Sequence, residues 1–315
     1  MFTTFGLKGR PRLFGTIDHD RVVPSQAGEI ALRDLTSVHA RFDGQILLRR
    51  QIIMPDHVHL RITWPPGIEN AIKAIGNFIG RFKQFSHYHI AGHAPSIWEE
   101  GYHDLICTSE RMNRSVDSYI DNNALKWWLM HMDRSLMHVD EPFILPVGGD
   151  GEIWRAVGDC SLAAIPRLVA IRISRRVPPD QLQAVVESCA HAADAQGYTF
   201  ISTFYSPGER LLFKRLAAMP DMRMVRLIPT FLDLAYRPHG DEPQLFARQR
   251  LLVLSRMADP AASPSRPELL DLNAIAASLA TATPGGKAIY VKPIPGGGGK
   301  IGYFPSCISH PDLAK

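Results

Sequence analysis

The spacing of hydrophobic positions changes several times along the first 130 residues, and these changes outline a series of strands and helices. Residues 2–14 are typical of a strand followed by a turn rich in Arg, Gly and Pro, and residues 27–42 have the spacing of an amphipathic helix. Two β-prone stretches, 45–54 and 57–64, are separated only by a Pro-Asp pair, which predicts a hairpin.

A second helix, a short strand and a third helix follow. In residues 68–89 apolar side chains recur every three or four positions, which predicts a helix. A strand is expected at 102–107, and Ser109 can cap a helix over residues 111–131. The order β-α-β-β-α-β-α is compatible with a ferredoxin-like antiparallel sheet covered by helices on one face, with an additional helix at the end. This α+β domain is expected to span residues 1–139.

The second half has a different organisation. Residues 140–160 contain prolines and a Gly-Gly pair and are interpreted as a linker. Strands and helices then alternate over residues 161–260, which predicts an α/β domain with a parallel, Rossmann-like sheet. The expected strands cover 168–173, 198–204, 222–228 and 251–255, and the expected helices cover 179–196 and 209–219. Residues 261–315 are rich in Ala, Ser, Pro and Gly, with a weak helix at 269–279, and we expect this tail to be partly disordered.

Composition limits the class of protein. At 315 residues, with 45% hydrophobic residues, the chain is long enough for two domains that each bury a core. No apolar run approaches the roughly 18 residues of a membrane span, and the start has no signal-peptide pattern. The four cysteines lie far apart, with no C-x-x-C pair, so we expect a soluble protein of the reducing cytoplasm. A net charge of +4 is compatible with a polyanionic partner but does not by itself indicate one.

His57 and His59 form an H-x-H pair at the start of an expected strand. Residues two apart on a strand point to the same face, so both imidazoles can reach one metal ion. The same spacing is also typical of hydrogen-bonded sheet histidines, which are the commoner case. Tyr119 and Asn123 are four apart in the last expected helix, which places a phenol beside an amide oxygen on one face. Either residue is equally compatible with ordinary packing or a surface position.

These four residue types together fit one reaction. An enzyme that cuts DNA by transesterification needs an oxygen nucleophile near the scissile phosphate and a cation that withdraws charge from the phosphate oxygens. The ligands of that cation must leave coordination positions open. Two histidines, an asparagine and a tyrosine satisfy these requirements.

Three ordered motifs extend the pattern: Met-Pro-Asp-His-Val-His-Leu at 54–60, Ile-Trp-Glu-Glu-Gly-Tyr-His-Asp at 97–104 and Tyr-Ile-Asp-Asn-Asn at 119–123. In order and spacing they closely resemble the REP-associated tyrosine transposases and the wider insertion-sequence family of single-tyrosine transposases. Residues 5–14 are similar to the opening strand of that family, and the resemblance covers about residues 1–130. It implies an HUH endonuclease fold, a divalent metal ion, Mg²⁺ or Mn²⁺, and nicking of single-stranded or hairpin DNA through a 5′-phosphotyrosine intermediate.

The resemblance also implies a role for each matching residue: His57 and His59 as metal ligands, Tyr119 as the nucleophile and Asn123 as the third ligand. Where the family often has proline after the Asn-Asn pair, this chain has Ala124, so we expect the helix to continue past the site. By ligand softness alone, imidazoles favour Mn²⁺ or Zn²⁺ over Mg²⁺, so the identity of the metal is left open.

Other side chains are candidates for DNA contacts or for the nucleophile. Arg61, Arg81 and Lys83 could contact phosphates, although a solvated surface is a slightly better interpretation of these cations. Tyr88 and Tyr102 are rival nucleophiles, but neither has an amide ligand one helical turn away. We therefore expect neither of them to attack DNA.

Several strands of the second half end on small or charged residues, and in a parallel sheet such ends form the ligand crevice. The segment Ser206-Pro207-Gly208 would place backbone N–H groups and a helix N-terminus at an anion, with Ser206 and Gly208 as candidate ligand-binding residues. This half is similar to the Rossmann-like domain of DNA-processing protein A, although several glycines of the corresponding turns are absent. A domain that positions DNA or a partner chain without a bound nucleotide is an equally good interpretation.

The sequence therefore predicts a metal-dependent DNA nickase or strand transferase in the first half. Two other classes stay open. One is a nucleic-acid-binding regulator with a relic HUH site and a ligand-reading second domain. The other is a hydrolase of small phosphoesters, against which the lack of clustered carboxylates around His57 counts. Single-stranded or hairpin DNA is the expected partner, no membrane partner is expected, and a homodimer is left open.

Overall fold

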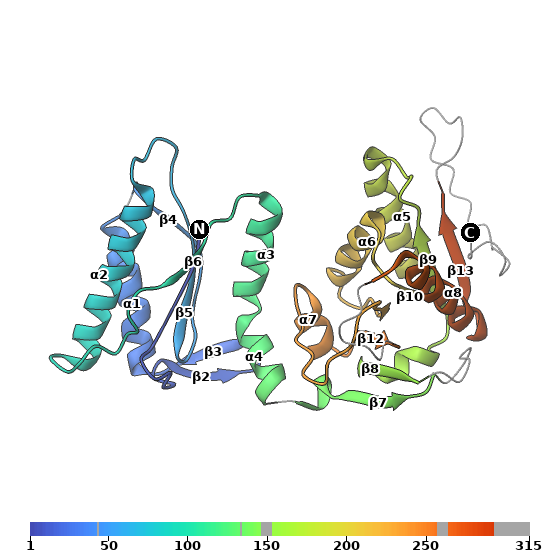
Figure 1. Ribbon diagram of the computed structural model, residues 1–315, viewed down its shortest axis with the longest axis horizontal. Coiled ribbons are helices and arrows are strands. Elements are labelled where there is room, and N and C mark those ends of the chain that lie inside the picture. The colour runs from blue at the N-terminus through green and yellow to red at the C-terminus, as the bar shows by residue number, and fades with distance from the viewer. Residues whose placement is uncertain (43, 133, 146–152, 257–263, 293–315) are drawn as a thin grey trace. The chain divides into compact units, whose positions relative to one another are not determined.

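The computed structural model describes residues 1–42, 44–132, 134–145, 153–256 and 264–292. The chain divides into two compact units, each with its own sheet and helices (Figure 1). The N-terminal unit comprises Met1–Met132 together with Pro238–Pro243, and the C-terminal unit comprises Asp133–Arg237 and the chain from Gln244 onward. The first boundary thus lies at Met132, whereas the sequence led us to expect residue 139.

The N-terminal unit is built on a four-stranded antiparallel sheet with the strand order β4-β5-β1-β6. The strands are β1 (Phe2–Gly6), β4 (Leu47–Ile53), β5 (His57–Thr63) and β6 (His103–Leu105). β4 and β5 form the hairpin that the Pro-Asp interruption predicted. The first strand of the chain occupies the centre of the sheet, because β1 pairs with β5 on one side and with β6 on the other.

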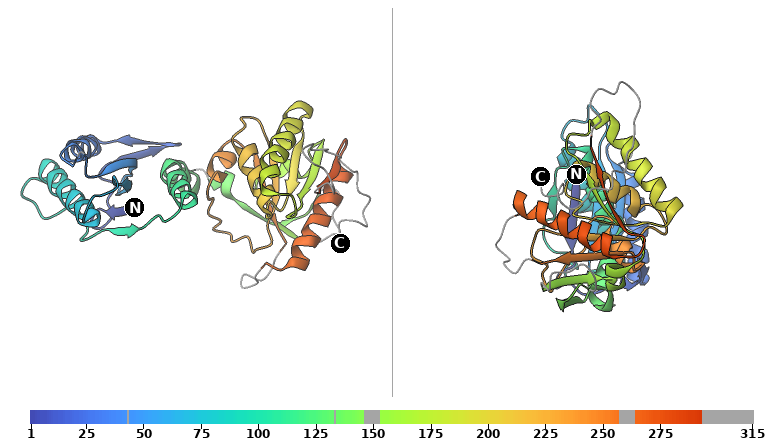
Figure 2. Two further views of the ribbon diagram at one scale, coloured as in Figure 1. Left: turned by 90° about the horizontal axis from the view of Figure 1, so that it is seen from above. Right: turned by 90° about the vertical axis from the view of Figure 1, so that its right-hand side faces the viewer.

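Two helices, α1 (Gln26–Ala40) and α2 (Ala71–Ala91), cover one face of this sheet (Figures 1 and 2). Alternate residues of β5, namely Val58, Leu60 and Ile62, are fully buried in the core that these helices share. Burial of an aliphatic side chain contributes about 1.5–3 kcal/mol, so this stripe fixes which face of β5 points inward. The other residues of β5 therefore point to the opposite face.

α3 (Glu110–Asp121) lies on that opposite face (Figure 1), and α4 (Asn123–His131) follows it. We expected one continuous helix over residues 111–131, because no proline follows the Asn-Asn pair; this prediction is wrong. The helix breaks at Asn122, whose φ of −97° and ψ of 6° are not helical. The Asn122 side chain donates a hydrogen bond to the Ser118 carbonyl at 3.0 Å, and such competition with the backbone favours an interruption even without proline.

The sequence pattern does not predict the small hairpin formed by β2 (Gly15–Asp18) and β3 (Arg21–Pro24). Its strands have four residues each, which is too short for a clear periodic signal. α4 packs beside this hairpin, where His19 stacks on Trp128 with ring centres 4.5 Å apart. The hairpin thus supports the helix that follows α3.

The C-terminal unit contains a seven-stranded sheet with the order β13-β9-β10-β11-β12-β8-β7. The first five strands in this order run parallel, as the alternation of strands and helices predicted, and β8 and β7 are antiparallel at one edge. The strands are β7 (Val139–Phe143), β8 (Trp154–Gly158), β9 (Leu168–Ile173), β10 (Thr199–Ser202), β11 (Met224–Leu227), β12 (Leu251–Ser255) and β13 (Lys287–Val291).

Helices cover both faces of the larger sheet: α5 (Pro179–Gln196) and α6 (Pro207–Ala217) lie on one face and α8 (Arg266–Ala282) on the other (Figure 2). Between α8 and the sheet, Leu272 of the helix and Ile201 of β10 belong to one buried cluster. Three short helical segments complete the described elements, η1 (Arg134–Met137), η2 (Cys160–Ala164) and α7 (Glu242–Ala247). Across the described segments, no helix is long and apolar enough to span a membrane.

Two expectations for weakly patterned segments need correction. The expected linker at 140–160 contains most of β7 and all of β8, and Trp154 is almost completely buried. In the tail expected from residue 261, α8 contains the helix predicted at 269–279 and extends beyond it, whereas β13, which pairs with β9, was not expected. Strands of five residues with interleaved polar side chains become recognisable only through their pairing partners. The rest of the expected tail, 293–315 with its glycine run at 296–299, lies outside the described residues.

Gly28, in the first turn of α1, tests how closely this helix packs on the preceding chain. A Cβ atom at Gly28 would lie 2.0 Å from the Phe14 carbonyl oxygen, so Gly28→Ala should destabilise the N-terminal unit by about 1–3 kcal/mol. Gly80→Ala is the matched control, because its Cβ would meet no neighbour within 4 Å, and alanine inside α2 should stabilise by up to about 1 kcal/mol. Urea unfolding measures both shifts, and equal midpoints for the two variants would contradict this packing.

Candidate functional site

Strand β5 presents His57, His59 and Arg61 on the face of the sheet that α3 covers, because its alternate residues fill the core on the other side. The neighbouring strand β1 adds Phe2 and Thr4 to the same face. The register places Thr4 opposite His59 and Phe2 opposite Arg61. Two strands far apart in sequence therefore supply the floor of one site.

The two imidazoles meet through their Nε2 atoms, which are 3.0 Å apart. Each Nδ1 atom has another partner: Asp56 Oδ1 lies 2.6 Å from His57 Nδ1, and Thr4 Oγ1 lies 2.7 Å from His59 Nδ1. Partners of this kind orient a histidine ring and direct its other nitrogen at a metal. Two nitrogens about 2.1 Å from one ion and at a right angle would lie about 3.0 Å apart, so the observed separation suits a shared cation.

His59 is deeply buried in this arrangement. It is 4% exposed and stacks on Phe2 with ring centres 5.4 Å apart. Burial, with smaller contributions from His57 and Arg10, lowers the pKa of His59 to about 3. The ring is therefore neutral at physiological pH, and the neutral imidazole is the form that binds a metal ion.

Besides the two histidines, the site offers no further cation ligand of the commonest types, His, Cys, Asp and Glu, among the described residues. Among the described residues, no group of three or more His, Cys, Asp and Glu side chains is placed to hold one ion. Asn123, the expected third ligand, is the first residue of α4 and is 8% exposed. Because the helix breaks before it, Asn123 does not follow Tyr119 by one turn of a continuous helix. Within the described part of the chain no hydrogen bond joins Asn123 to either histidine, and its ligand role stays a prediction.

Tyr119 reaches the histidine pair from α3. Its hydroxyl oxygen lies 3.4 Å from His59 Nε2. Its ring meets the His59 ring edge to face, with centres 5.2 Å apart, and the Phe2 ring at 5.8 Å. The side chain is nevertheless 41% exposed. The phenol is thus held by two rings beside the histidines and is accessible from solvent.

Neither rival tyrosine lies beside the histidine pair. Tyr88 is on α2, which covers the other face of the sheet, and it is 60% exposed there. Tyr102 packs against the core of the N-terminal unit, where burial, with a smaller contribution from Asp104, raises the pKa of its phenol. Of these three tyrosines, Tyr119 is the one that contacts His59.

Arg61, expected to contact phosphate, forms an ion pair with Asp117 of α3. Its Nη2 atom donates to Asp117 Oδ2 at 2.9 Å and its Nε atom donates to Oδ1, so the pair is bidentate. The two side chains are 12% and 22% exposed. The pair ties the helix that carries Tyr119 to the strand that carries the histidines. Sequence reasoning missed this role, because no local pattern around Asp117 indicates a partner 56 positions away.

The other two expected phosphate contacts lie elsewhere in the N-terminal unit. Arg81 is exposed on α2, on the opposite face of the sheet from the histidine pair. Lys83 donates to the backbone carbonyls of Glu99, at 2.8 Å, and of Gly101. Burial lowers the pKa of the Lys83 ammonium group. Lys83 therefore secures the loop before β6 instead of extending into solvent.

The anion position expected at the start of α6 holds a carboxylate of the chain itself. Glu209 accepts hydrogen bonds from the backbone N–H groups of Ile173 (3.1 Å), Tyr205 (3.1 Å) and Ser206 (3.3 Å). The Thr203 hydroxyl donates a fourth hydrogen bond to it at 3.3 Å. Glu209 is only 3% exposed, so this internal anion is part of the folded core of the C-terminal unit.

The two residues expected to bind a ligand there, Ser206 and Gly208, serve the start of the helix. The Ser206 hydroxyl donates to the Ile173 carbonyl at 3.0 Å and accepts from the Glu209 N–H at 3.3 Å. Gly208 is buried, and a Cβ atom there would lie 2.6 Å from Ile173 Cγ2. Of the groups that the sequence suggested for anion binding, the N–H and the hydroxyl of Ser206 are therefore engaged within the chain.

No known protein family matches this chain, and no curated protein matches it. Several solved structures are similar to part of the chain. One is DNA processing protein A from Helicobacter pylori, from a study of how that protein binds single-stranded DNA. It has a TM-score of 0.37 and 20% sequence identity, and the match covers 51% of this chain and 70% of that one. A REP-associated tyrosine transposase bound to a REP hairpin has a TM-score of 0.31 and 18% identity over 40% of this chain and 66% of that one. A candidate transposase from Deinococcus radiodurans R1 has a TM-score of 0.24 and 20% identity over 38% of this chain and 87% of that one. Because all three TM-scores lie below 0.5, the site has to be interpreted from its own residues.

The low pKa of His59 predicts a pH dependence of folding. Its pKa is about 3 in the folded chain against 6.5 for the ordinary group, so the unfolded state binds more protons between these values. The contribution of His59 to the free energy of unfolding is therefore full above about pH 6.5 and decreases as the pH falls towards 3. In the metal-free protein, the NMR signal of the His59 Cε1 proton should stay constant between about pH 5 and 8, whereas in concentrated urea it should titrate near the ordinary value. Titration of the folded protein near neutral pH would contradict the buried geometry.

Proposed function

We propose that the N-terminal unit is a metal-dependent tyrosine endonuclease of the HUH type, which nicks and transfers single strands of DNA, including hairpins. One observation carries the proposal: the Tyr119 hydroxyl lies 3.4 Å from His59 Nε2, which lies 3.0 Å from His57 Nε2. A nucleophile and a metal site this close can act on the same phosphate. The strand order β4-β5-β1-β6, which is the order of a ferredoxin-like sheet, and the three sequence motifs also support it.

The chemical step would be direct attack of Tyr119 on phosphorus. A bond forms between the Tyr119 hydroxyl oxygen and phosphorus, and the bond from phosphorus to the 3′-oxygen breaks. The phenol proton leaves to solvent on the exposed side, the 3′-oxygen takes up a proton, and a 5′-phosphotyrosine and a free 3′-hydroxyl result. A divalent cation on His57 and His59 would withdraw charge from the phosphate oxygens and favour loss of the phenol proton. Phe2 holds both rings in place during this step.

Mg²⁺ or Mn²⁺ would be the working ion. The two nitrogen ligands favour Mn²⁺ over Mg²⁺, because imidazole suits softer ions better than hard ones. We include Asn123 in the proposed ligand set, because it begins the helix that directly follows the one carrying Tyr119.

A DNA-binding regulator that does not cleave is the second candidate. Two features of the site favour it. Arg61 on the histidine face is engaged by Asp117, and among the described residues no third His, Cys, Asp or Glu joins the pair to complete a metal site. In this case the N-terminal unit would bind hairpin DNA in the presence of Mn²⁺ without forming a covalent adduct, and the C-terminal unit would read a ligand.

Tyr119→Phe tests the nucleophile. The variant keeps the ring that packs on His59 and Phe2 but lacks the attacking oxygen, so covalent adduct formation should fall by at least about 1,000-fold. The assay incubates the full-length protein with labelled hairpin and single-stranded oligonucleotides in Mn²⁺ and detects the adduct on a denaturing gel. Tyr88→Phe is the matched control and should retain full activity. An adduct that persists in Tyr119→Phe, or one that is lost only in Tyr88→Phe, would assign the nucleophile elsewhere.

The ligand set has its own test in the binding of Mn²⁺ to the protein without DNA. His57→Ala should weaken binding by more than about 100-fold, since loss of a group that merely orients a ligand costs about 10–100-fold. Asn123→Ala should weaken Mn²⁺ binding by about tenfold. Asn113→Ala, in the first turn of α3, is the matched control and should leave the affinity unchanged. Calorimetric titration measures all three affinities. Unchanged affinity in Asn123→Ala beside a large loss in His57→Ala would remove Asn123 from the ligand set and leave the histidine pair in place.

A further inference from the structure

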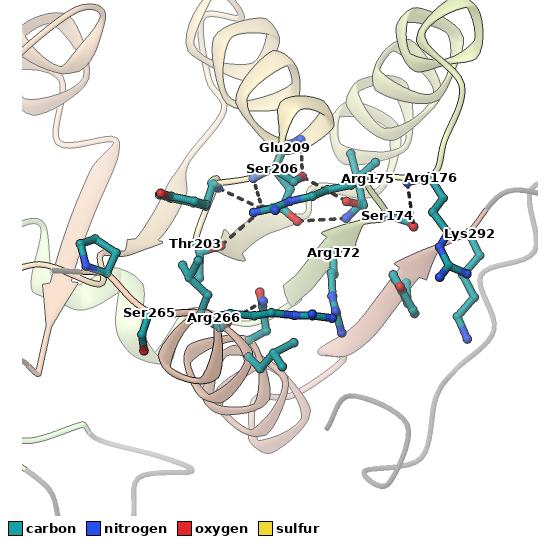
Figure 3. Close-up of a pocket in the computed structure, with 17 residues that line it drawn as sticks. Arg172, Ser174, Arg175, Arg176, Thr203, Ser206, Glu209, Ser265, Arg266 and Lys292 are labelled. Atoms are coloured by element: carbon teal, nitrogen blue, oxygen red, sulfur yellow. Dashed lines mark hydrogen bonds between the residues drawn. The ribbon is translucent and has the colours of Figure 1, made fainter. Parts of the chain in front are cut away.

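A cavity of about 880 Å³ opens at the carboxyl ends of the parallel strands in the C-terminal unit (Figure 3). Its walls come from the ends of β9 and β13, from the loop before α6 and from the first turns of α8. Small-molecule sites usually measure about 300–1,000 Å³ and occur at this end of a parallel sheet. Size and location therefore both suit a small ligand.

The lining of the cavity is strongly cationic. It includes five basic side chains, Arg172, Arg175, Arg176, Arg266 and Lys292. They come from three separate parts of the chain, so the fold creates the charge and no single basic run does. The one carboxylate in the lining, Glu209, is 3% exposed and already accepts four hydrogen bonds at the start of α6. An anion in the cavity would therefore meet an excess of positive charge.

The position of the arginines defines how an anion would be held. In Figure 3, Arg172 and Arg266 lie on one side of the cavity, and Arg175 lies on the other. Guanidinium groups bind phosphate oxygens through paired N–H donors of matching geometry. Because Glu209 accepts from the backbone N–H groups of Tyr205 and Ser206 before α6, a phosphate in the cavity would rely on arginine side chains.

The cavity also has an apolar and aromatic part. Tyr205, Tyr290 and Leu269 contribute to its lining. The Arg172 guanidinium lies 4.7 Å from the centre of the Tyr290 ring, and the Arg210 guanidinium lies 5.1 Å from that of Tyr205. Aromatic faces and planar cations at such positions are surfaces on which a nucleobase stacks. A ligand that combines a base with phosphate groups would use both parts.

We propose that this cavity binds a free nucleotide of the size of a nucleoside diphosphate, with its phosphates on the arginines and its base beside the tyrosines. Every residue in this argument belongs to the C-terminal unit, so the site does not depend on nicking by Tyr119. The cavity volume favours a single nucleotide over a strand. The C-terminal unit would accordingly sense or use a nucleotide.

Calorimetric titration of the full-length protein with ADP tests the site, and inorganic pyrophosphate probes the phosphate part alone. Both should bind, whereas adenosine, which lacks phosphate, should bind at least about tenfold more weakly than ADP. The double variant Arg175→Gln/Arg266→Gln loses a cation from each side of the cavity and should weaken ADP binding by at least about tenfold. Arg223→Gln is the matched control, because Arg223 is exposed directly before β11, at the opposite end of the strands. It should bind ADP as the unaltered protein does.

Several results would overturn the proposal. Equal affinities for ADP and adenosine would show that no phosphate site exists, and this comparison needs no variant. Equal affinities for ADP in the double variant and in Arg223→Gln would place the site elsewhere. If an unphosphorylated oligothymidylate binds more tightly than ADP, and the double variant loses this binding, the cavity is a strand-binding surface. Binding of only a 5′-phosphorylated oligonucleotide, and not of ADP, would make it a site for strand ends. Tyr119→Phe should leave ADP binding unchanged, so failure of the nicking proposal can be told apart from failure of this one.

Discussion

The alternation of strand β5 is the constraint on which the histidine site depends. Its apolar residues fill the core with α1 and α2, so His57, His59 and Arg61 are forced onto the other face. A slip of one residue in the pairing with β1 would exchange the two sets and bury two imidazoles and a guanidinium in an apolar core. The energy of the core thus sets the direction of the polar side chains, and the same register delivers Thr4 to His59 Nδ1.

The site also needs α3 at a fixed distance, and the Arg61–Asp117 pair supplies this connection. Both partners are mostly buried, so loss of either would leave an uncompensated charge in a poorly hydrated place. That cost resists movement of the helix away from the strand. His59 and Tyr119 differ in exposure at this junction: the imidazole is buried, and so neutral, while the phenol stays accessible to solvent. Two ion pairs join α3 to the sheet, Arg61–Asp117 and the more exposed Arg50–Asp121, and this packing allows both arrangements.

The two units share a feature that the amino-acid composition does not reveal, namely a carboxylate that is engaged within the chain. In each of them a carboxylate of the chain occupies a group that could otherwise bind phosphate: Asp117 takes the guanidinium of Arg61, and Glu209 takes the amides at the start of α6. These internal anions organise the structure, since each joins two elements. Any affinity for phosphate must then come from other groups, among them the cationic cavity of the C-terminal unit.

The sequence by itself determined the order of most elements, the β4–β5 hairpin and the parallel strands of the second half, because hydrophobic periodicity is a local property. It also placed His57 and His59 on one face, since that follows from a spacing of two. The tertiary structure alone decided which side chains complete the site. Thr4 and Asp117 are 55 and 56 positions from their partners, and Glu209 closes on Ile173 from 36 positions away. The short strands β7, β8 and β13 were decided in the same way. Such contacts depend on strand register and on packing between distant segments, and neither leaves a periodic trace in the sequence.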